Sequence, residues 1–213
     1  MTTIYRDADA SNRLVFDPAG RLYACSQGRR AIVRYDTAGT RTVLADRFAG
    51  RRLNSPNDLA LDARGGVWFT DPRYGDDHHD RELDHCAVYR LAPPEGEAGA
   101  WPIRRLSFDT TRPNGILLSF DERILYVTQS DYDRGAARQL RAYAIEDEGS
   151  LGPGRVLEEH PVPAGRPTNC TFGGADRTDL YVTTISGHLY RVRNTGRQGA
   201  LPPPLIPPYT GKA

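Results

Sequence analysis

The sequence predicts an all-β fold, a β-propeller of about four blades that forms either a closed ring or an open crescent. One template recurs along the chain: an Asn, an alternating strand, a tight turn and a second strand. Its copies begin 45, 57 and 55 residues apart, and a recurrence of roughly 40–50 residues built from short strands is typical of four-stranded propeller blades. The 21 Gly and 16 Pro among the 213 residues supply the turns that many hairpins need.

The template occurs in four copies, and each copy opens with an Asn. The copies are residues 12–17 (NRLVFD) with 22–25, 57–62 (NDLALD) with 67–70, 114–119 (NGILLS) with 125–128, and 169–172 (NCTF) with 180–183. Equivalent strand starts border the central channel of a propeller at one height. We therefore expect four amide oxygens to converge on one axial mouth. A ring of amide and carboxylate oxygens is what a hard cation such as Ca²⁺ coordinates.

The strands group into blades in chain order. We expect blades at residues 14–45, 59 to about 109, 116–157 and 170–192, preceded by a lone strand at 2–6. The turns at 17–20 (DPAG) and 36–39 (DTAG) place Pro and Gly where tight turns favour them. Residues 1–200 are predicted to form a single β-propeller domain. Residues 201–213 form a Pro-rich tail, whose five Pro lack the N–H donor that a central strand needs.

Composition excludes several classes of protein. The net charge is +1 and no block of like charge occurs, so neither a nucleic-acid partner nor a membrane surface is predicted. The chain contains no long apolar run that would span a bilayer. The N-terminal residues MTTIYRDADASNR are too polar for a secretory signal. Three Cys without metal-binding spacing favour a reducing, cytoplasmic location.

Three stretches resemble a known family. They are LNSPNDLALDARGGVWFTDPRYG, RPNGILLSFDERILYVTQSD and GRPTNCTFGGADRTDLYVTT, and they are similar to the gluconolactonase / senescence-marker-protein (regucalcin) family. Members of that family are six-bladed propellers that hydrolyse sugar or other lactones with a divalent metal on the propeller axis. The resemblance implies a metal cofactor here, Ca²⁺ in preference to Zn²⁺, and a small-molecule lactone as partner.

The resemblance also assigns residues. Asn57 and Asn114 fall on the positions that bind the metal and orient the substrate, and Asp58 falls where relatives use an Asp to brace the channel or to hold a second ion. The further substrate-binding candidates are Asn12, Asn169, Gln27 and Tyr74. For Asn12 and Asn169 the alternative is that each caps a turn through its own backbone. Gln27 stands where relatives often carry a His, so a proton-transfer role is lost there.

The chain departs from the family pattern in two places. The early Glu ligand of the family, in a Glu-Gly-Pro-x-Trp context, has no counterpart, and about one repeat is absent at the N-terminus. A second repeat, whose Asp-Gly-Met supplies a ligand and general base, is absent where residues 149–153 (GSLGP) run into 154–163. We therefore expect a six-bladed design shortened to about four blades. Asp131 is then the candidate catalytic carboxylate, although a turn-forming or Arg-paired role is the alternative.

The loop at 74–84 (YGDDHHDRELD) is rich in acidic and His residues. Asp76, Asp77, His78, His79 and Asp80 are adjacent in sequence, and neighbouring side chains in an extended loop point apart, whereas metal ligands must converge. A solvated loop is the better interpretation. By resemblance the loop overhangs the channel mouth and could act as a lid.

Two functions follow as hypotheses. The first is a metal-dependent hydrolase that opens a lactone, in which the cation polarises the ring carbonyl and a carboxylate removes a proton from water. The alternative is a catalytically inactive, shortened propeller that acts as a binding module. In either case blade edges facing a gap would be unpaired and could mediate a homodimer.

Overall fold

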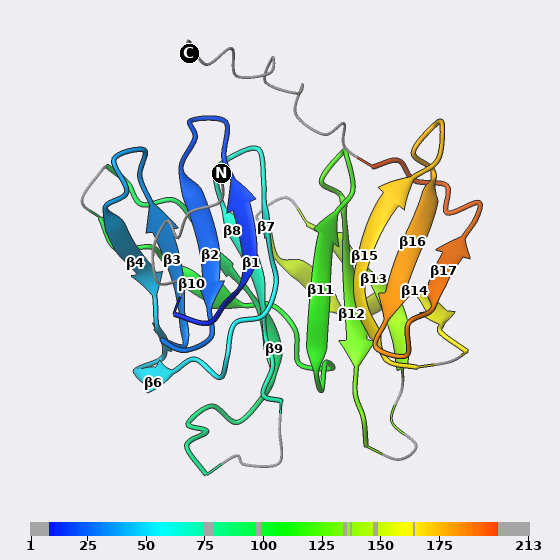
Figure 1. Ribbon diagram of the computed structural model, residues 1–213, viewed down its shortest axis with the longest axis horizontal. Helices are drawn as coiled ribbons and strands as arrows, with labels where there is room; N and C mark the ends of the chain where they lie inside the picture. The colour runs from blue at the N-terminus through cyan, green and yellow to red at the C-terminus, as the bar shows by residue number, and fades with distance from the viewer. Residues whose placement is uncertain are drawn as a thin grey trace, which may run out of the picture.

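The computed structural model consists of four antiparallel sheets arranged as propeller blades (Figure 1). It describes residues 9–199 except 75–78, 97–98, 134–135, 137, 147–148 and 164. Across this described part the regular elements are all strands, so the predicted all-β fold is confirmed. The strand expected at 2–6 and the tail expected at 201–213 lie outside the described residues. No helix in the described part could cross a membrane.

Each sheet follows chain order from its first strand outward. The first sheet holds β1 (Ser11–Phe16), β2 (Leu22–Ser26), β3 (Ala31–Tyr35) and β4 (Arg41–Ala45). The second holds β7 (Leu59–Leu61), β8 (Val67–Asp71), β9 (Ala87–Leu91) and β10 (Ile103–Arg105). The third holds β11 (Pro113–Leu118), β12 (Ile124–Ser130), β13 (Arg138–Ile145) and β14 (Leu151–Pro161). The fourth has three strands, β15 (Pro167–Gly173), β16 (Asp179–Thr184) and β17 (Leu189–Val192), and a short hairpin pairs β5 (Arg47–Phe48) with β6 (Arg51–Arg52).

The turn between the first two strands repeats from sheet to sheet. In each turn an Asp carboxylate accepts a hydrogen bond from a backbone N–H two residues later, which satisfies a donor that the ladder leaves free. The four Asp are Asp17, Asp62, Asp121 and Asp176, with N···O distances of 3.0, 3.0, 3.2 and 3.2 Å. This recurrence is independent of the Asn template and supports the same four-part division of the chain.

The first strand of each sheet is the inner one. β1 packs beside β7, β7 beside β11, and β11 beside β15. The hydrophobic clusters follow the same order: one joins the first sheet to the second around Ile32 and Phe69, one joins the second to the third around Trp68 and Val127, and one joins the third to the fourth around Tyr126 and Leu180.

The fourth sheet and the first are different from these neighbours. Among the described residues, no hydrophobic cluster joins these two sheets. Large apolar side chains are exposed on both, with Leu14 and Phe16 of β1 at 54% and 67%, and Ile185 and Leu189 at 62% and 65%. The described sheets therefore pack as a row with three apolar interfaces. In Figure 1, β4 and β17 lie at opposite sides of the molecule.

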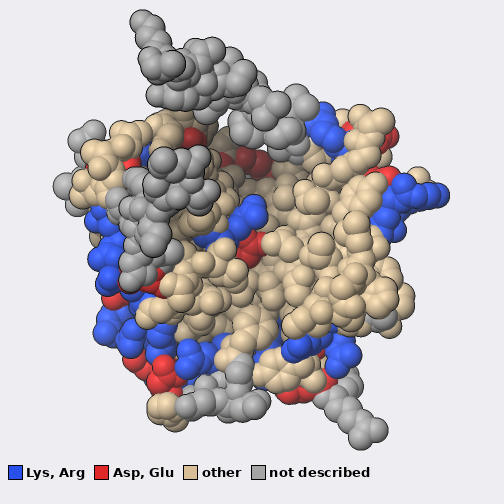
Figure 2. Space-filling view, viewed as in Figure 1, with Lys and Arg blue, Asp and Glu red and all other residues tan. Residues whose placement is uncertain are grey.

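The charged side chains leave much of one face uncovered. Figure 2 shows a largely uncharged area just right of the centre, with a basic and an acidic group side by side at the centre and further charged groups along the left, lower and upper right margins. Charges of both signs lie close together there, as expected for a chain with a net charge of +1.

Candidate functional site

We locate the candidate site where the inner strands begin. Three of these strands are irregular at the same level. The pairing register shifts between Ser11 and Leu14 in β1, between Pro113 and Ile116 in β11, and between Pro167 and Asn169 in β15. Such bulges re-aim side chains and are common next to functional sites. In the second sheet the same level is the Asn57–Asp58 step just before β7.

The bulges show which residues are equivalent. A Thr hydroxyl on the second strand lies opposite a backbone carbonyl of the inner strand, and the O···O distances are 3.5 Å for Thr70 and Asp58, 3.4 Å for Thr128 and Gly115, and 3.4 Å for Thr183 and Asn169. Asn169 therefore occupies the place of Asp58 and Gly115. It does not occupy the place of Asn57 and Asn114.

The expectation of four equivalent Asn is thus wrong for the fourth sheet. Thr168 stands where the second and third sheets have Asn57 and Asn114. The sequence hides this shift because the first turn of the fourth sheet is one residue longer: Asn169 precedes Leu180 by 11 residues, whereas Gly115 precedes Leu125 by 10. Counting back 11 residues from the second strand gives Asn114 in the third sheet and Asn169 in the fourth. The strand pairing nevertheless makes Asn169 equivalent to Gly115.

Asp58 bonds to all four sheets. Its Oδ1 accepts the backbone N–H of Leu59 at 2.8 Å and lies 3.2 Å from Nε of Arg13 on β1. Its Oδ2 accepts the N–H of Ile116 on β11 at 3.1 Å and the Nδ2–H of Asn169 on β15 at 3.0 Å. Each carboxylate oxygen thus has two donors. The sequence leaves two roles open for Asp58, which are to brace the channel or to hold a second ion. These contacts are those of a residue that braces the channel.

Burial dominates the electrostatics around Asp58. It raises the pKa of the Asp58 carboxyl, while Arg13 and the N–H groups of Ile116 and Leu59 oppose the shift. The pKa values of the buried thiols of Cys25 and Cys170 are raised as well, by burial and by the charge of Asp58. Both thiols are therefore protonated at neutral pH and are poor nucleophiles.

Asn57, Asn114 and Tyr74 gather around Thr70. The N–H of Asn57 donates to the Thr70 carbonyl at 2.9 Å, and the Thr70 hydroxyl donates to the Asn114 carbonyl at 2.6 Å. The Tyr74 phenol forms hydrogen bonds with Asn114 and Ser130, and burial raises its pKa. Tyr74 is therefore a hydrogen-bond donor at neutral pH. The two Asn singled out by the sequence begin neighbouring inner strands, and the backbone of each forms a hydrogen bond with Thr70.

The other sequence candidates lie around this group. Asn12 is exposed at the bulge of β1, where its neighbour Arg13 is the residue that reaches Asp58. Gln27 is partly buried in the turn after β2, where its carbonyl accepts the N–H of Arg30 at 3.0 Å. Both ends of the Asn169 amide form a hydrogen bond, because its Oδ1 accepts the N–H of Cys170 at 2.8 Å while its Nδ2 donates to Asp58.

Asp131 is buried and ion-paired. Its Oδ1 lies 2.5 Å from Nη1 of Arg112 and accepts the N–H of Asp133 at 3.0 Å. Although burial raises the pKa of Asp131, hydrogen bonds from Thr111, Asp133 and Arg112 hold it below its usual value. The structure therefore gives Asp131 the Arg-paired arrangement, in which a carboxylate is a weak base.

Sequence reasoning missed Asp71, which anchors the loop that carries Asn57 and Asp58. Asp71 ends β8, is fully buried, and accepts the N–H groups of Asn54 at 2.8 Å and Ser55 at 2.7 Å. Burial raises the pKa of Asp71 to about 7. The available signal was an Asp that directly follows Val-Trp-Phe-Thr, a strand with apolar residues on both faces and therefore without a solvent-facing side.

The loop at 74–84 is partly described. Asp76, Asp77 and His78 lie outside the described residues. Asp80 bonds to Arg30 at 3.1 Å and to Arg73 at 2.5 Å, while His79 is exposed. Asp80 therefore ties the end of the loop to the first and second sheets.

Comparisons with known proteins agree with this architecture. The pattern of the SMP-30/Gluconolactonase/LRE-like region matches residues 2–157 and, a second time, residues 150–186. The chain belongs to this family. The two matches meet at 150–157, which is where the sequence analysis locates an absent repeat.

Two relatives of this family member are named gluconolactonases. The gluconolactonase of Zymomonas mobilis is 35% identical over 144 residues, which is 65% of this chain and 38% of that protein. A gluconolactonase structure from Xanthomonas campestris is 34% identical with a TM-score of 0.69, and the match covers 92% of this chain and 63% of that one. The chain thus spans less than two thirds of either relative.

A more distant structure shows the fold alone. The virginiamycin B lyase of Staphylococcus aureus is 16% identical with a TM-score of 0.54, and the match covers 90% of this chain and 58% of the lyase. A propeller scaffold hosts many chemistries, so function must be argued from the site.

The described residues of the candidate site do not fit the divalent cation that the family resemblance implies. Among the described residues no group of three or more His, Cys, Asp or Glu side chains could hold a metal ion. Asp58 has two donors on each oxygen and Asp131 is paired with Arg112. The donors left are neutral amides and a phenol, whereas useful Ca²⁺ affinity normally needs carboxylates.

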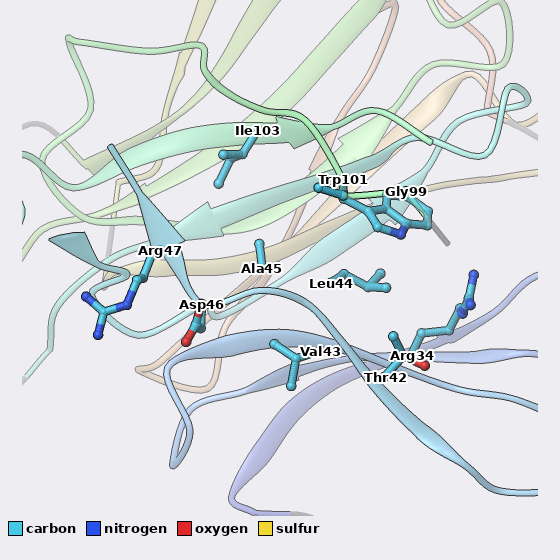
Figure 3. Close-up of a pocket in the computed structure, with 11 residues that line it drawn as sticks. Arg34, Thr42, Val43, Leu44, Ala45, Asp46, Arg47, Gly99, Trp101 and Ile103 are labelled. Atoms are coloured by element: carbon cyan, nitrogen blue, oxygen red, sulfur yellow. The ribbon is translucent and has the colours of Figure 1, made fainter. Parts of the chain in front are cut away.

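A separate cavity lies at the outer edge of the first two sheets (Figure 3). It has a volume of about 420 Å³ and is lined by β4, by the Asp46–Arg47 step and by residues 99–103. The Arg34 guanidinium lies 6.0 Å from the centre of the Trp101 ring there. The cavity is bordered by outer strands, so it is distinct from the site at the inner strand starts.

Proposed function

We propose that the chain acts in gluconolactonase-like hydrolysis, opening the ring of a small sugar lactone or a related lactone. The observation that carries the proposal is the position of Asn57 and Asn114, which begin neighbouring inner strands and share Thr70 as a backbone partner. Identities of 35% and 34% to two gluconolactonases support the same reaction class.

The chain's own residues would bind and orient the lactone. Tyr74 and the two Asn offer hydrogen-bond donors for the ring oxygens, and a positioned donor stabilises the negative charge that develops on the carbonyl oxygen. Tyr74 keeps its proton at neutral pH because burial raises the pKa of its phenol. Asp131 would be a weak proton acceptor in this scheme, since Arg112 stabilises its charged form.

We propose a cofactor only for a rearranged site, because the arrangement described above does not fit one. A divalent cation, Ca²⁺ in preference to Zn²⁺, would have Asn57, Asn114 and Asp58 as ligands. To become a ligand, Asp58 would have to give up hydrogen bonds that now reach other sheets. No step of the proposed reaction is assigned to such an ion.

The test is acid release from glucono-δ-lactone, followed with a pH indicator and corrected for spontaneous hydrolysis. We expect a protein-dependent rate that falls at least tenfold in Asn114→Ala, with Arg21→Gln, in the turn between β1 and β2, as control. Parallel reactions with EDTA and with added Ca²⁺ test the cofactor. No protein-dependent rate on a panel of aldonolactones would overturn the proposed activity.

A second candidate is a binding module without turnover. It is favoured by the state of two carboxylates, because Asp58 has two donors on each oxygen and Asp131 is ion-paired with Arg112. This candidate predicts binding of a lactone without acid release. The same assay, run beside calorimetry with the lactone, separates the two functions.

Self-association and location are also proposals. The exposed Leu14 and Phe16 of β1 and Leu189 of β17 offer apolar surface to a second copy of the chain, and we expect a homodimer detectable by sedimentation. A cytoplasmic location is proposed because all three Cys are free and buried.

A further inference from the structure

Arg13 is the basic member of a polar layer at the axis. The layer contains the four equivalent residues Arg13, Asp58, Gly115 and Asn169, one from each sheet. Arg13 and Asp58 form an ion pair at 3.2 Å, and Asn169 donates to the other oxygen of Asp58. The layer therefore carries its own cation next to the carboxylate.

The two charges of this pair differ in their access to water. The Arg13 side chain is 46% exposed, whereas that of Asp58 is 4% exposed. Both oxygens of Asp58 are occupied by buried donors. Arg13 uses Nε for the pair, and a guanidinium has four further N–H donors on its two terminal nitrogens. Arg13 is therefore the member of this ion pair that a ligand can contact.

Gly115 keeps the layer compact. A Cβ on Gly115 would lie 2.6 Å from Cα of Asn169, so only Gly allows β11 and β15 to approach this closely. The third sheet consequently adds neither a charge nor a side chain to the layer. Arg13 is then the charged group of the layer that reaches the surface.

A guanidinium at this position also disfavours a metal ion. A divalent cation bound to Asp58 would have to share its oxygens with Arg13, and like charges destabilise each other at short range. An Arg with free terminal N–H groups favours a planar anion, because the two groups match the two oxygens of a carboxylate.

We infer that this layer is an anion site built on Arg13, which binds the carboxylate of a polyhydroxy acid without a divalent metal. The class of acid rests on the proposed function, because opening a sugar lactone yields a hydroxy-carboxylate. The preference for an anion rests only on the exposed guanidinium and its buried partner. The site would bind the product of ring opening.

The experiment is titration calorimetry with D-gluconate in buffer containing EDTA. D-Glucitol is the ligand control, since it has the same polyol chain without the carboxylate. The protein variants are Arg13→Gln and Arg13→Lys, with Arg21→Gln as the matched control. Arg21 is also about half exposed and also uses Nε to pair with an Asp, at 2.6 Å from Asp17, but it lies in the turn between β1 and β2, at the other end of β1 from Arg13. Thermal unfolding of each variant verifies the fold.

We expect gluconate to bind in EDTA and glucitol not to bind. Affinity for gluconate should fall at least tenfold in Arg13→Gln, fall less in Arg13→Lys, and be unchanged in Arg21→Gln. The inference is overturned if gluconate binds only after Ca²⁺ is added, if glucitol binds equally well, if Arg13→Gln binds like the wild type, or if gluconate does not bind at all. Acid release from lactones, measured separately, decides the proposed function whichever way the binding experiment ends.

Discussion

Two buried carboxylates of the second sheet, Asp58 and Asp71, perform different tasks. Asp58 takes its donors from all four sheets and has an Arg partner. Asp71 takes two backbone N–H groups from one loop of its own sheet. Burial raises the pKa of both groups. The difference indicates that Asp58 holds the sheets together, whereas Asp71 shapes the loop that carries the site.

The largest effect is expected for Asp58→Ala. Removing this carboxylate leaves the buried N–H of Ile116, the amide of Asn169 and the Arg13 guanidinium without their acceptor. Leaving a buried donor without its acceptor costs about 1–3 kcal/mol, and because the Ile116 N–H and the Asn169 amide are both affected, we expect a loss of about 2–6 kcal/mol in urea unfolding. Asp84→Ala is the control, because Asp84 pairs with Arg105 but is exposed. Equal losses in the two variants would contradict the bracing role.

The next effect is expected for Gly115→Ala. The added methyl would lie 2.6 Å from Cα of Asn169, and backbone cannot move aside as a flexible side chain can. Overpacking of this kind typically costs about 1–3 kcal/mol. The free energy of unfolding measures it, and a stability equal to that of the wild type would show that the third and fourth sheets are not in close contact at this level.

A smaller effect is expected for Asn169→Ala. The variant loses one hydrogen bond to Asp58 and one to the N–H of Cys170, worth about 1 kcal/mol each. A double-mutant cycle with Asp58→Ala should show coupling, since the two residues are in contact. Strict additivity would mean that Asn169 acts apart from Asp58.

Asp71→Asn differs from these substitutions because it should change how stability depends on pH. The carboxyl has an ordinary pKa of 3.8 when unfolded and about 7 when folded. Between these values only the folded protein keeps the proton, so the stability from this group is full below pH 4 and is lost as pH rises to 7. The unfolding midpoint of the wild type should therefore fall relative to that of the variant as pH rises from 4.5 to 8. Parallel curves would show that Asp71 does not titrate there.

The repeats were predictable because they depend on local chemistry. The Asn template and turn residues such as Asp17 and Gly20 divide the chain correctly, since strand alternation and turn geometry are determined within a few residues. Asn57 and Asn114 were found by their matching strand starts. The equivalence of Asn169 to Asp58 could not be found from the sequence, because an extra turn residue shifts Asn169 by one place. Only the strand pairing reveals this shift.

The partners of the buried charges could not be predicted from local sequence. Arg13 lies 45 residues before Asp58, and nothing around either residue indicates that they meet. Asp71 likewise depends on two N–H groups 16 and 17 residues earlier. Such contacts follow from how sheets pack, and the free energy of burial decides them, so strand patterns alone do not contain them.

The long sequence separation between Asp58 and its partner Asn169 has a consequence for how the protein folds. Its bond to Asn169 spans 111 residues, whereas each sheet is built from strands adjacent in sequence. Contacts of long sequence separation form late because closing a long loop is slow and entropically unfavourable. We therefore expect Asp58 to be incompletely bonded during synthesis until residues near 169 have left the ribosome, so that docking of the fourth sheet completes the axis.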